Sequence, residues 1–329
     1  MNSFNGAYFT PDYFYRKETE RKSLKRVGAL CGIALLSYVL IQNVIALGIQ
    51  SAGLWDKYTT DSFFQCGADI FLTFAGVLLP FAVINRLMKK RTGTEEPLVF
   101  ESRVSKGSLI ISVIAGSGLC MAANTVSSLF IGIMSAFGFS LTSPDVPMPE
   151  GTEGFLMSFI RVVVVAAMAE ELSLRGYVMG NLKKYGDIFS IGASAVLFAI
   201  MHGNLVQAPF ALMAGFAIGY FTVKTRTLWT GILIHGVNNF ISLVLSYIIE
   251  IAGEETATLL TAAVIYGFGF AGIIAAMIFS RRNKGISLDS GDTILTSGEK
   301  VTAFFLNIPM ILAFSLMVYI TSNYIEFGR

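Results

Sequence analysis

The chain has 329 residues, of which 54% are hydrophobic and 14% are charged, and its formal net charge is +2 at pH 7. A typical soluble domain carries about 25% charged residues. This composition therefore excludes an ordinary soluble enzyme and predicts a protein that lies mostly in a lipid bilayer. No cluster of basic residues indicates a nucleic-acid partner.

The chain opens with a polar leader, residues 1–26, which is too long and too charged for the basic end of a cleavable signal peptide. The first apolar segment after this leader is therefore expected to be retained. Cys31, Cys66 and Cys120 lie in three separate apolar segments, without CxxC or Cys/His ligand spacing. We interpret them as small buried side chains.

Nine apolar segments follow one another along the chain, and most approach the roughly 20 residues needed to cross a hydrocarbon core of about 30 Å. The fifth and sixth are short. The pattern predicts an all-α fold, a polytopic transmembrane helical bundle with about eight or nine transmembrane helices. The segments are about 27–49, 63–86, 107–137, 155–180, 188–202, 206–223, 228–249, 256–280 and 301–322.

Lysine and arginine collect in alternate connections between these segments. Because cytoplasmic loops are enriched in these residues, the basic connections and the N-terminus are predicted to be cytoplasmic, and the C-terminus to lie outside. We expect an integral membrane protein of a prokaryotic plasma membrane. No connection much exceeds 20 residues, so any chemistry is expected within the membrane. The basic groups fall at 17–26, 86–91, 183–184, 224–226 and 281–284.

Several charged residues lie inside apolar segments, where each costs roughly 2.5 to 3.5 kcal/mol near the helix centre on insertion scales. Asp69 and Arg161 are both predicted to lie toward the outer end, and we expect them to pair. Glu171 and Arg175 are four residues apart, share a helix face and are predicted to form a structural ion pair. Glu170 lies about 100° around the same helix and is left free to act.

The sequence contains two histidines, His202 and His235, and both lie inside apolar segments. His202 follows Phe198 by four residues and Asn239 follows His235 by four, so each pair shares a helix face. At 1.5 Å per residue, Glu170, both histidines and Asn239 reach overlapping depths between the cytoplasmic half and the midplane. These four are predicted to converge on a functional site within the membrane, because ionisable residues there usually carry function. Phe198 is predicted to pack.

The sequences EELSLRG, FAIMH and HGVNN occur in this order on separate segments. They resemble the EExxxR, FxxxH and HxxxN/D motifs of the CPBP family, which groups CAAX-processing endopeptidases with bacteriocin-processing and self-immunity proteins, also called the Abi family. The resemblance covers about residues 155–250. It implies an intramembrane endopeptidase with a catalytic core at 151–250, between transmembrane helices of residues 27–150 and 251–329.

The resemblance also implies a role for each motif residue. Glu170 and His202 would activate water, and His235 and Asn239 would stabilise the oxyanion. Arg175, with Glu171, would hold the site together. Every motif position carries the residue that the family pattern requires.

Metal dependence stays open at this point, because the resemblance is compatible with a glutamate-type or a metal-dependent endopeptidase. We expect that no cofactor is required, since the chain has no HExxH spacing and Glu171 is already matched to Arg175. The alternative is a divalent metal such as zinc, bound by Glu170, His202 and His235. A serine or cysteine nucleophile is disfavoured because the cysteines are remote from these segments in sequence.

Two non-proteolytic functions remain as alternatives. The first is a non-catalytic membrane scaffold or a bacteriocin self-immunity protein of the same family. The second is a transporter or proton-relay protein, because intramembrane Glu and His also mark ion pathways. The expected partners are the lipid bilayer and a peptide or membrane-protein substrate, without nucleic acid. Gly215 and Gly219 have GxxxG spacing, which indicates close helix packing.

Overall fold

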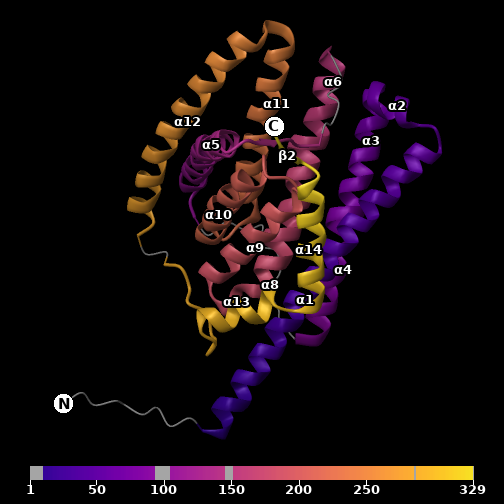
Figure 1. Ribbon diagram of the computed structural model, residues 1–329. Coiled ribbons are helices and arrows are strands. Elements are labelled where there is room, and N and C mark those ends of the chain that lie inside the picture. The colour runs from indigo at the N-terminus through magenta and orange to yellow at the C-terminus, as the bar shows by residue number, and fades with distance from the viewer. Residues whose placement is uncertain (1–9, 93–103, 145–150, 285–286, 329) are drawn as a thin grey trace.

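The computed structural model describes residues 10–92, 104–144, 151–284 and 287–328, so residues 1–9 of the predicted leader lie outside the described part of the chain. The described residues are almost entirely helical, which confirms the all-α prediction (Figure 1). The short strands β1 (Phe139–Leu141) and β2 (Ile325–Phe327) form one antiparallel pair beside the C-terminus.

All nine predicted apolar segments lie on helices. The first three segments and the connection between the first two contain α1 (Pro11–Ser51), α2 (Trp55–Thr60), α3 (Ser62–Leu72), η1 (Thr73–Leu78), α4 (Leu79–Thr92) and α5 (Lys106–Ala136). The fourth occupies α6 (Gly151–Ser158), η2 (Phe159–Ala166), α7 (Ala167–Glu171), η3 (Leu172–Met179), α8 (Gly180–Leu182) and η4 (Lys183–Tyr185). The rest occupy α9 (Asp187–Met201), α10 (Ala208–Thr225), α11 (Leu228–Ala252), α12 (Glu254–Arg282), α13 (Ser297–Phe305) and α14 (Ile308–Ser322).

Five helices in the described part of the chain are long and apolar enough to cross a membrane, and a sixth span results if α13 and α14 are counted together. These two helices meet at an angle of 74°. The fourth predicted segment is helical but carries several charged residues, and α9 has 15 residues. The structure therefore supports an integral membrane protein, whereas the number of eight or nine spans stays a prediction.

The first helix begins earlier than the apolar pattern predicts, because Thr10 caps it and residues 11–26 of the predicted leader continue into the first apolar segment. The Thr10 hydroxyl oxygen accepts a hydrogen bond from the Tyr13 amide at 3.3 Å, which satisfies one of the free amides at the helix start. Arg16 pairs with Asp292 at 2.7 Å and Lys17 pairs with Glu299 at 2.8 Å. The leader portion of α1 is thus joined to α13 and to the segment before it.

The predicted pair between Asp69 and Arg161 is confirmed. Arg161 Nη1 lies 2.5 Å from Asp69 Oδ2, and this bridge joins α3 to η2. The Tyr58 hydroxyl donates a hydrogen bond to the other Asp69 oxygen at 2.7 Å. Two charges that would each be costly in hydrocarbon are therefore neutralised together.

The predicted close packing at Gly215 and Gly219 is also confirmed. A Cβ atom at Gly215 would lie 2.9 Å from the Ala195 Cα atom, and one at Gly219 would lie 3.0 Å from the Ile191 side chain. Both distances are too short for real Cβ contacts, so these glycines let α10 approach α9 closely. This approach matters for the site because α9 ends at His202.

Two groups of buried apolar side chains form the interior. The first joins side chains of α1, α4, η3, α9, α13 and α14, and the second joins those of α5, α10, α11 and α12. Figure 1 shows α12 and α5 on one side of the bundle and α1, α3 and α4 on the other, with α9 and α10 between them. Helix α10 contributes to both groups, because Ala211 belongs to the first and Ala214 and Ile218 belong to the second.

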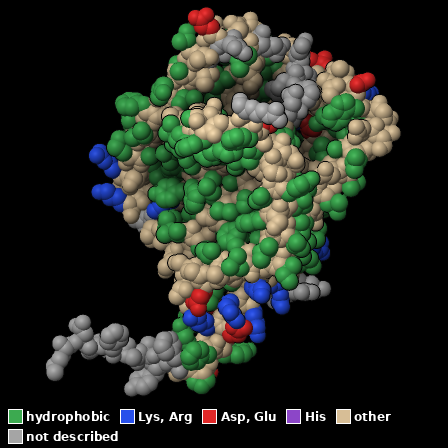
Figure 2. Space-filling view, in the orientation of Figure 1, with side chains coloured by type: hydrophobic (Ala, Val, Ile, Leu, Met, Phe, Trp, Pro, Cys, Tyr) green, Lys and Arg blue, Asp and Glu red, His purple; other side chains and the backbone are tan. Residues whose placement is uncertain are grey.

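The visible surface carries a wide area of hydrophobic side chains, as expected where lipid replaces water (Figure 2). Lys and Arg lie mainly below this area and at its left edge, while Asp and Glu side chains appear both above it and among the basic side chains below it. The exposed apolar residues include Ile188, Ile308 and Val318, which are 73%, 75% and 69% exposed. This distribution fits a chain whose helices face a bilayer.

Candidate functional site

Glu171 bridges two partners on different helices. Its Oε1 atom lies 2.9 Å from Arg175 Nη1 and 2.9 Å from His235 Nδ1. The Glu171–Arg175 pair confirms the sequence prediction, and both side chains are fully buried. The bond from Glu171 to His235 was not predicted, because 64 residues separate the two. It joins α7 to α11 and fixes the orientation of the imidazole ring.

The Arg175 guanidinium has two further contacts that hold it in place. Its Nη2 atom donates a hydrogen bond to the Gly215 carbonyl oxygen at 3.2 Å. The guanidinium carbon lies 4.8 Å from the centre of the Phe198 ring, within the range of a cation–π contact. Arg175 therefore connects η3 to α9 and α10, which supports its predicted role of holding the site together.

Phe198 packs, as predicted, and it also spaces the two histidines. Its ring centre lies 4.9 Å from that of His202 and 5.5 Å from that of His235, and both ring pairs meet edge to face. The side chain is 3% exposed. One aromatic ring thus contacts Arg175 and both imidazoles, and it restricts their movement.

His202 lies at the C-terminal end of α9, where the helix stops inside the protein. Its Nδ1 atom lies 2.8 Å from the Phe198 carbonyl oxygen. Because a carbonyl oxygen only accepts, Nδ1 must carry the hydrogen. In a neutral ring the Nε2 atom then keeps its lone pair and can accept a proton.

Asn204 stabilises the turn that follows His202. Its side-chain amide donates to the His202 carbonyl oxygen at 2.8 Å, and its side-chain oxygen accepts from the Gln207 amide at 2.9 Å. Asn204 is 1% exposed. Since α9 spans about 22 Å at 1.5 Å per residue, it is shorter than the hydrocarbon core of about 30 Å. Backbone that leaves a helix at such depth needs partners inside the protein, and Asn204 supplies them.

Glu170 differs from Glu171 as the helix-face argument predicts. Its side chain is 24% exposed, and its Oε2 atom lies 3.9 Å from His235 Nε2. That separation is too long for a direct hydrogen bond, but one water molecule could bond to both atoms. Glu170 also interacts electrostatically with His202 and with Tyr38 of α1. It is therefore a partly exposed carboxylate near both histidines, and its contact with His235 is looser than the 2.9 Å contact of Glu171 with the same ring.

Asn239 and Asn238 take different positions on α11. The Asn239 side-chain amide donates a hydrogen bond to the Val162 carbonyl oxygen at 3.0 Å, which joins α11 to η2. One N–H group of Asn239 is thus used for packing. Asn238 was not singled out from the sequence, yet its side chain is 7% exposed and its carbonyl oxygen has no hydrogen-bond partner among the described residues.

A small cavity of about 40 Å³ lies between these side chains. Both histidines, Asn238 and Asn239 supply its polar surface, and Phe198 forms part of its wall. The structure therefore brings His202, His235 and Asn239 together as predicted, with Glu170 beside His235. The other lining residues, from α5 and α10, are Cys120, Phe210, Ala214 and Ile218.

Cys120 corrects one part of the sequence argument. Distance along the sequence disfavoured a cysteine at the site, but α5 places Cys120 at the wall of this cavity. The residue is fully buried, as predicted, and it belongs to the apolar group formed by α5, α10, α11 and α12. No spacing signal in the sequence connects α5 to the histidines, because the contact depends on how the helices pack.

The described residues do not form a ready metal site. No group of three or more His, Cys, Asp or Glu side chains in the described part of the chain is placed to hold a metal ion. Glu170, His202 and His235 are ligand types that zinc accepts, but they are not arranged as such a group in this structure. The chemistry below is therefore derived from these side chains and water.

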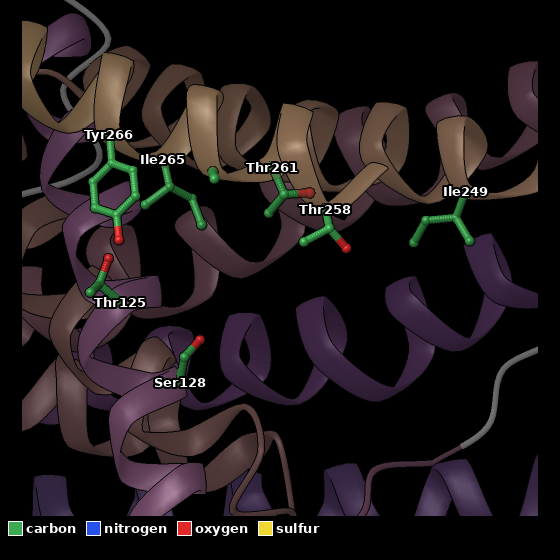
Figure 3. Close-up of a pocket in the computed structure, with 8 residues that line it drawn as sticks. Thr125, Ser128, Ile249, Thr258, Thr261, Ile265 and Tyr266 are labelled. Carbon is green, nitrogen blue, oxygen red and sulfur yellow. The ribbon is translucent and has the colours of Figure 1, made fainter. Parts of the chain in front are cut away.

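A larger cavity of about 480 Å³ lies between α5, α11 and α12, away from both histidines. Figure 3 shows Thr258, Thr261 and Tyr266 projecting from α12 toward Thr125 and Ser128 on α5. Its described lining residues carry hydroxyl groups but no carboxylate or imidazole. The two imidazoles of the smaller cavity have no counterpart among them.

The comparison with known families identifies the same part of the chain. Residues 152–241 match the family model described as Rce1-like, Type II CAAX prenyl endopeptidase Rce1-like. The match confirms the resemblance inferred from the three motifs, and its range contains Glu170, His202, His235 and Asn239. It supports an intramembrane endopeptidase at the level of the family. No curated protein and no solved structure matches the chain.

Proposed function

We propose that this chain, whose residues 152–241 match the Rce1-like family, hydrolyses a peptide bond at the cavity lined by α5, α10, α11 and the end of α9, beside Glu170 of α7. The observation that carries the proposal is the meeting of a partly exposed carboxylate with two histidines whose Nδ1 atoms are already bonded. Each histidine therefore has its Nε2 atom free for chemistry. This is the donor and acceptor set that water activation requires.

In the proposed reaction, Glu170 and His202 act on water. Glu170 accepts one proton from the water molecule, and the water oxygen forms a bond to the peptide carbonyl carbon. The carbonyl oxygen becomes an oxyanion. When the C–N bond breaks, the proton held by Glu170 passes to the leaving amine nitrogen, so the products are a carboxyl group and an amine.

His235 and Asn239 are proposed to stabilise the oxyanion. His235 Nδ1 is fixed by Glu171, and in its protonated form Nε2 donates a hydrogen bond toward the cavity. Asn239 uses one N–H group on Val162 and keeps the second for the oxyanion. Donors that are held in place before the reaction are the ones that lower the barrier most.

The test is cleavage by purified protein reconstituted in liposomes. The substrates are a prenylated peptide ending in a CAAX sequence, its unprenylated form, a leader peptide and a membrane-protein segment. We expect Glu170→Gln to lower kcat by about 10² to 10⁴ fold, the range for loss of a general base. The folded state is checked by the thermal unfolding midpoint, which should stay near that of the wild type because Glu170 is partly exposed and its 3.9 Å contact with His235 is too long for a hydrogen bond.

Two further arms decide the mechanism. We expect activity to resist a strong chelator, and loss of cleavage that zinc restores would instead show a metal enzyme. Cys120→Ser should cleave within a few fold of the wild type, whereas complete loss with normal folding would favour a thiol nucleophile. If the wild type cleaves none of these substrates and Glu170→Gln keeps the wild-type phenotype, the chain acts as a non-catalytic membrane partner.

A further inference from the structure

Asn238 is a buried polar residue that the proposed mechanism does not yet use. It lies on α11 three residues after His235, so the two side chains leave the helix on the same face. The Asn238 side chain lines the small cavity together with both histidines, and it is 7% exposed. Its position places it next to the reacting groups rather than at a lipid-facing surface.

The carbonyl oxygen of the Asn238 side chain has no hydrogen-bond partner among the described residues. Its neighbours at the cavity are already bonded: His202 Nδ1 to Phe198, His235 Nδ1 to Glu171, and the Asn239 amide to Val162. Buried polar groups are almost always paired with protein or with water. An unpaired acceptor that faces a cavity therefore indicates a molecule that donates to it.

The cavity has the size and the chemistry for water. Its volume is about 40 Å³, and a water molecule needs at least about 10 to 15 Å³ and two to four polar partners. His202 and Asn238 both line it, and each side chain carries an acceptor, the Nε2 atom of His202 and the carbonyl oxygen of Asn238. A water molecule between them can donate one hydrogen to each.

We propose that Asn238 is a further catalytic residue, whose side-chain oxygen accepts a hydrogen bond from the attacking water. This inference rests on the hydrolytic function proposed above. The water proton bonded to His202 Nε2 passes to that nitrogen and on to Glu170, which later delivers it to the leaving amine, while the O–H group held by Asn238 stays on the oxygen and becomes part of the product carboxyl group. The bond to Asn238 turns the oxygen lone pair toward the peptide carbonyl carbon. Asn239, one residue later, instead holds α11 against η2 and donates to the oxyanion.

The test compares three substitutions in the reconstituted full chain, with the peptide cleaved by the wild type. Asn238→Leu has a similar volume without an acceptor, and we expect kcat to fall about 100-fold, the scale of a misplaced reactant, with KM within threefold. Asn238→Asp keeps acceptor oxygens and should be at least tenfold faster than Asn238→Leu. Ser127→Ala removes another buried, unpartnered oxygen outside the cavity and should cleave like the wild type.

Thermal unfolding gives a readout that does not depend on activity. Asn238→Leu breaks no hydrogen bond between described protein groups at its oxygen, so its unfolding midpoint should equal or exceed that of the wild type. Asn239→Leu removes the bond to Val162, so its midpoint should fall. A purely structural Asn238 would behave like Asn239 in this measurement.

Each result decides the inference. The role of Asn238 is overturned if Asn238→Leu cleaves within threefold of the wild type, or if its unfolding midpoint falls as that of Asn239→Leu does. In either case the proposed function still stands if Glu170→Gln is inactive. Equal rates for the Leu and Asp variants overturn the acceptor role. A wild type that cleaves no faster than Glu170→Gln overturns the proposed function, and the inference with it.

Discussion

Buried charges at the site are stabilised in a chain of contacts rather than as one pair. The sequence predicts the Glu171–Arg175 pair from its spacing, but it does not show that the same carboxylate oxygen also holds His235. The other carboxylate oxygen has no hydrogen-bond partner among the described residues and faces Gly231, where an added Cβ atom would lie 2.8 Å from it. Glycine at that position lets α11 approach Glu171.

Removing Arg175 should therefore destabilise the protein strongly. Arg175→Met leaves the Glu171 carboxylate buried without its guanidinium, and breaking a buried pair in this way costs about 3 to 5 kcal/mol. We expect a lower unfolding midpoint and a lower yield of folded protein in detergent. The double variant Glu171→Gln with Arg175→Met removes both charges and should regain part of the stability. A double variant as unstable as Arg175→Met alone would mean that the arginine acts mainly through Gly215 and Phe198.

At the scale of the helix, the end of α9 is placed by residues outside the family match. The Tyr38 hydroxyl of α1 donates a hydrogen bond at 3.2 Å to the carbonyl oxygen of Met201, the residue before His202. Asn204 holds the turn after His202 from the other side. The histidine is thus positioned by a partner on α1 as well as by the local turn.

We expect Tyr38→Phe to weaken catalysis more than folding. Loss of one hydrogen bond is worth about 0.5 to 1.5 kcal/mol, so cleavage should slow about twofold to twelvefold if the bond is needed to place His202. The measurement is kcat and KM beside the unfolding midpoint. Tyr319→Phe, an exposed tyrosine on α14, is the matched control. If both variants cleave at the same rate, the Tyr38 bond contributes only to packing.

Wide helical turns surround the candidate glutamates. The π-helical stretches η2 and η3 lie directly before and after α7, which carries Glu170 and Glu171. Such turns are rare and often occur at functional sites. The prediction that Glu170 and Glu171 lie on different helix faces assumes α-helical spacing. It agrees with the structure because α7, which carries both residues, is α-helical.

On the scale of the whole molecule, one ion pair joins the N-terminal helices to the matched segment. Asp69 on α3 bonds Arg161 on η2, and Tyr58 on α2 bonds the same aspartate. Arg161 is 7% exposed, so its end of this bridge is buried inside the protein. It fixes the position of the fourth segment relative to α3.

Reversing both charges should test this bridge. Asp69→Arg and Arg161→Asp should each lower the amount of folded protein, because each leaves two like charges facing one another. The double variant restores opposite charges and should recover expression at least in part. The measurement is the folded fraction by size-exclusion chromatography. A double variant no better than either single one would show that the pair does not contribute to assembly.

The sequence by itself determined the helical class, the membrane setting, the Glu171–Arg175 and Asp69–Arg161 pairs, and the resemblance of residues 152–241 to the Rce1-like family. These depend on composition, on spacing along one helix, or on the need to neutralise charge in lipid. Topology and the number of spans stay predictions from the Lys and Arg pattern, because length and composition alone do not fix them.

Only the tertiary structure decided which side chains share the cavity. Cys120 and Tyr38 carry no motif, and each reaches the site through packing between helices that are distant in sequence. Asn238 lies inside HGVNN, but only the structure shows that its side-chain oxygen has no hydrogen-bond partner among the described residues. Packing between helices also explains the bond between Glu171 and His235. It explains as well why one Asn239 N–H group is bonded to Val162. Periodicity assigns a residue to a helix face, whereas the partner that this face meets depends on close approaches at residues such as Gly215 and Gly231.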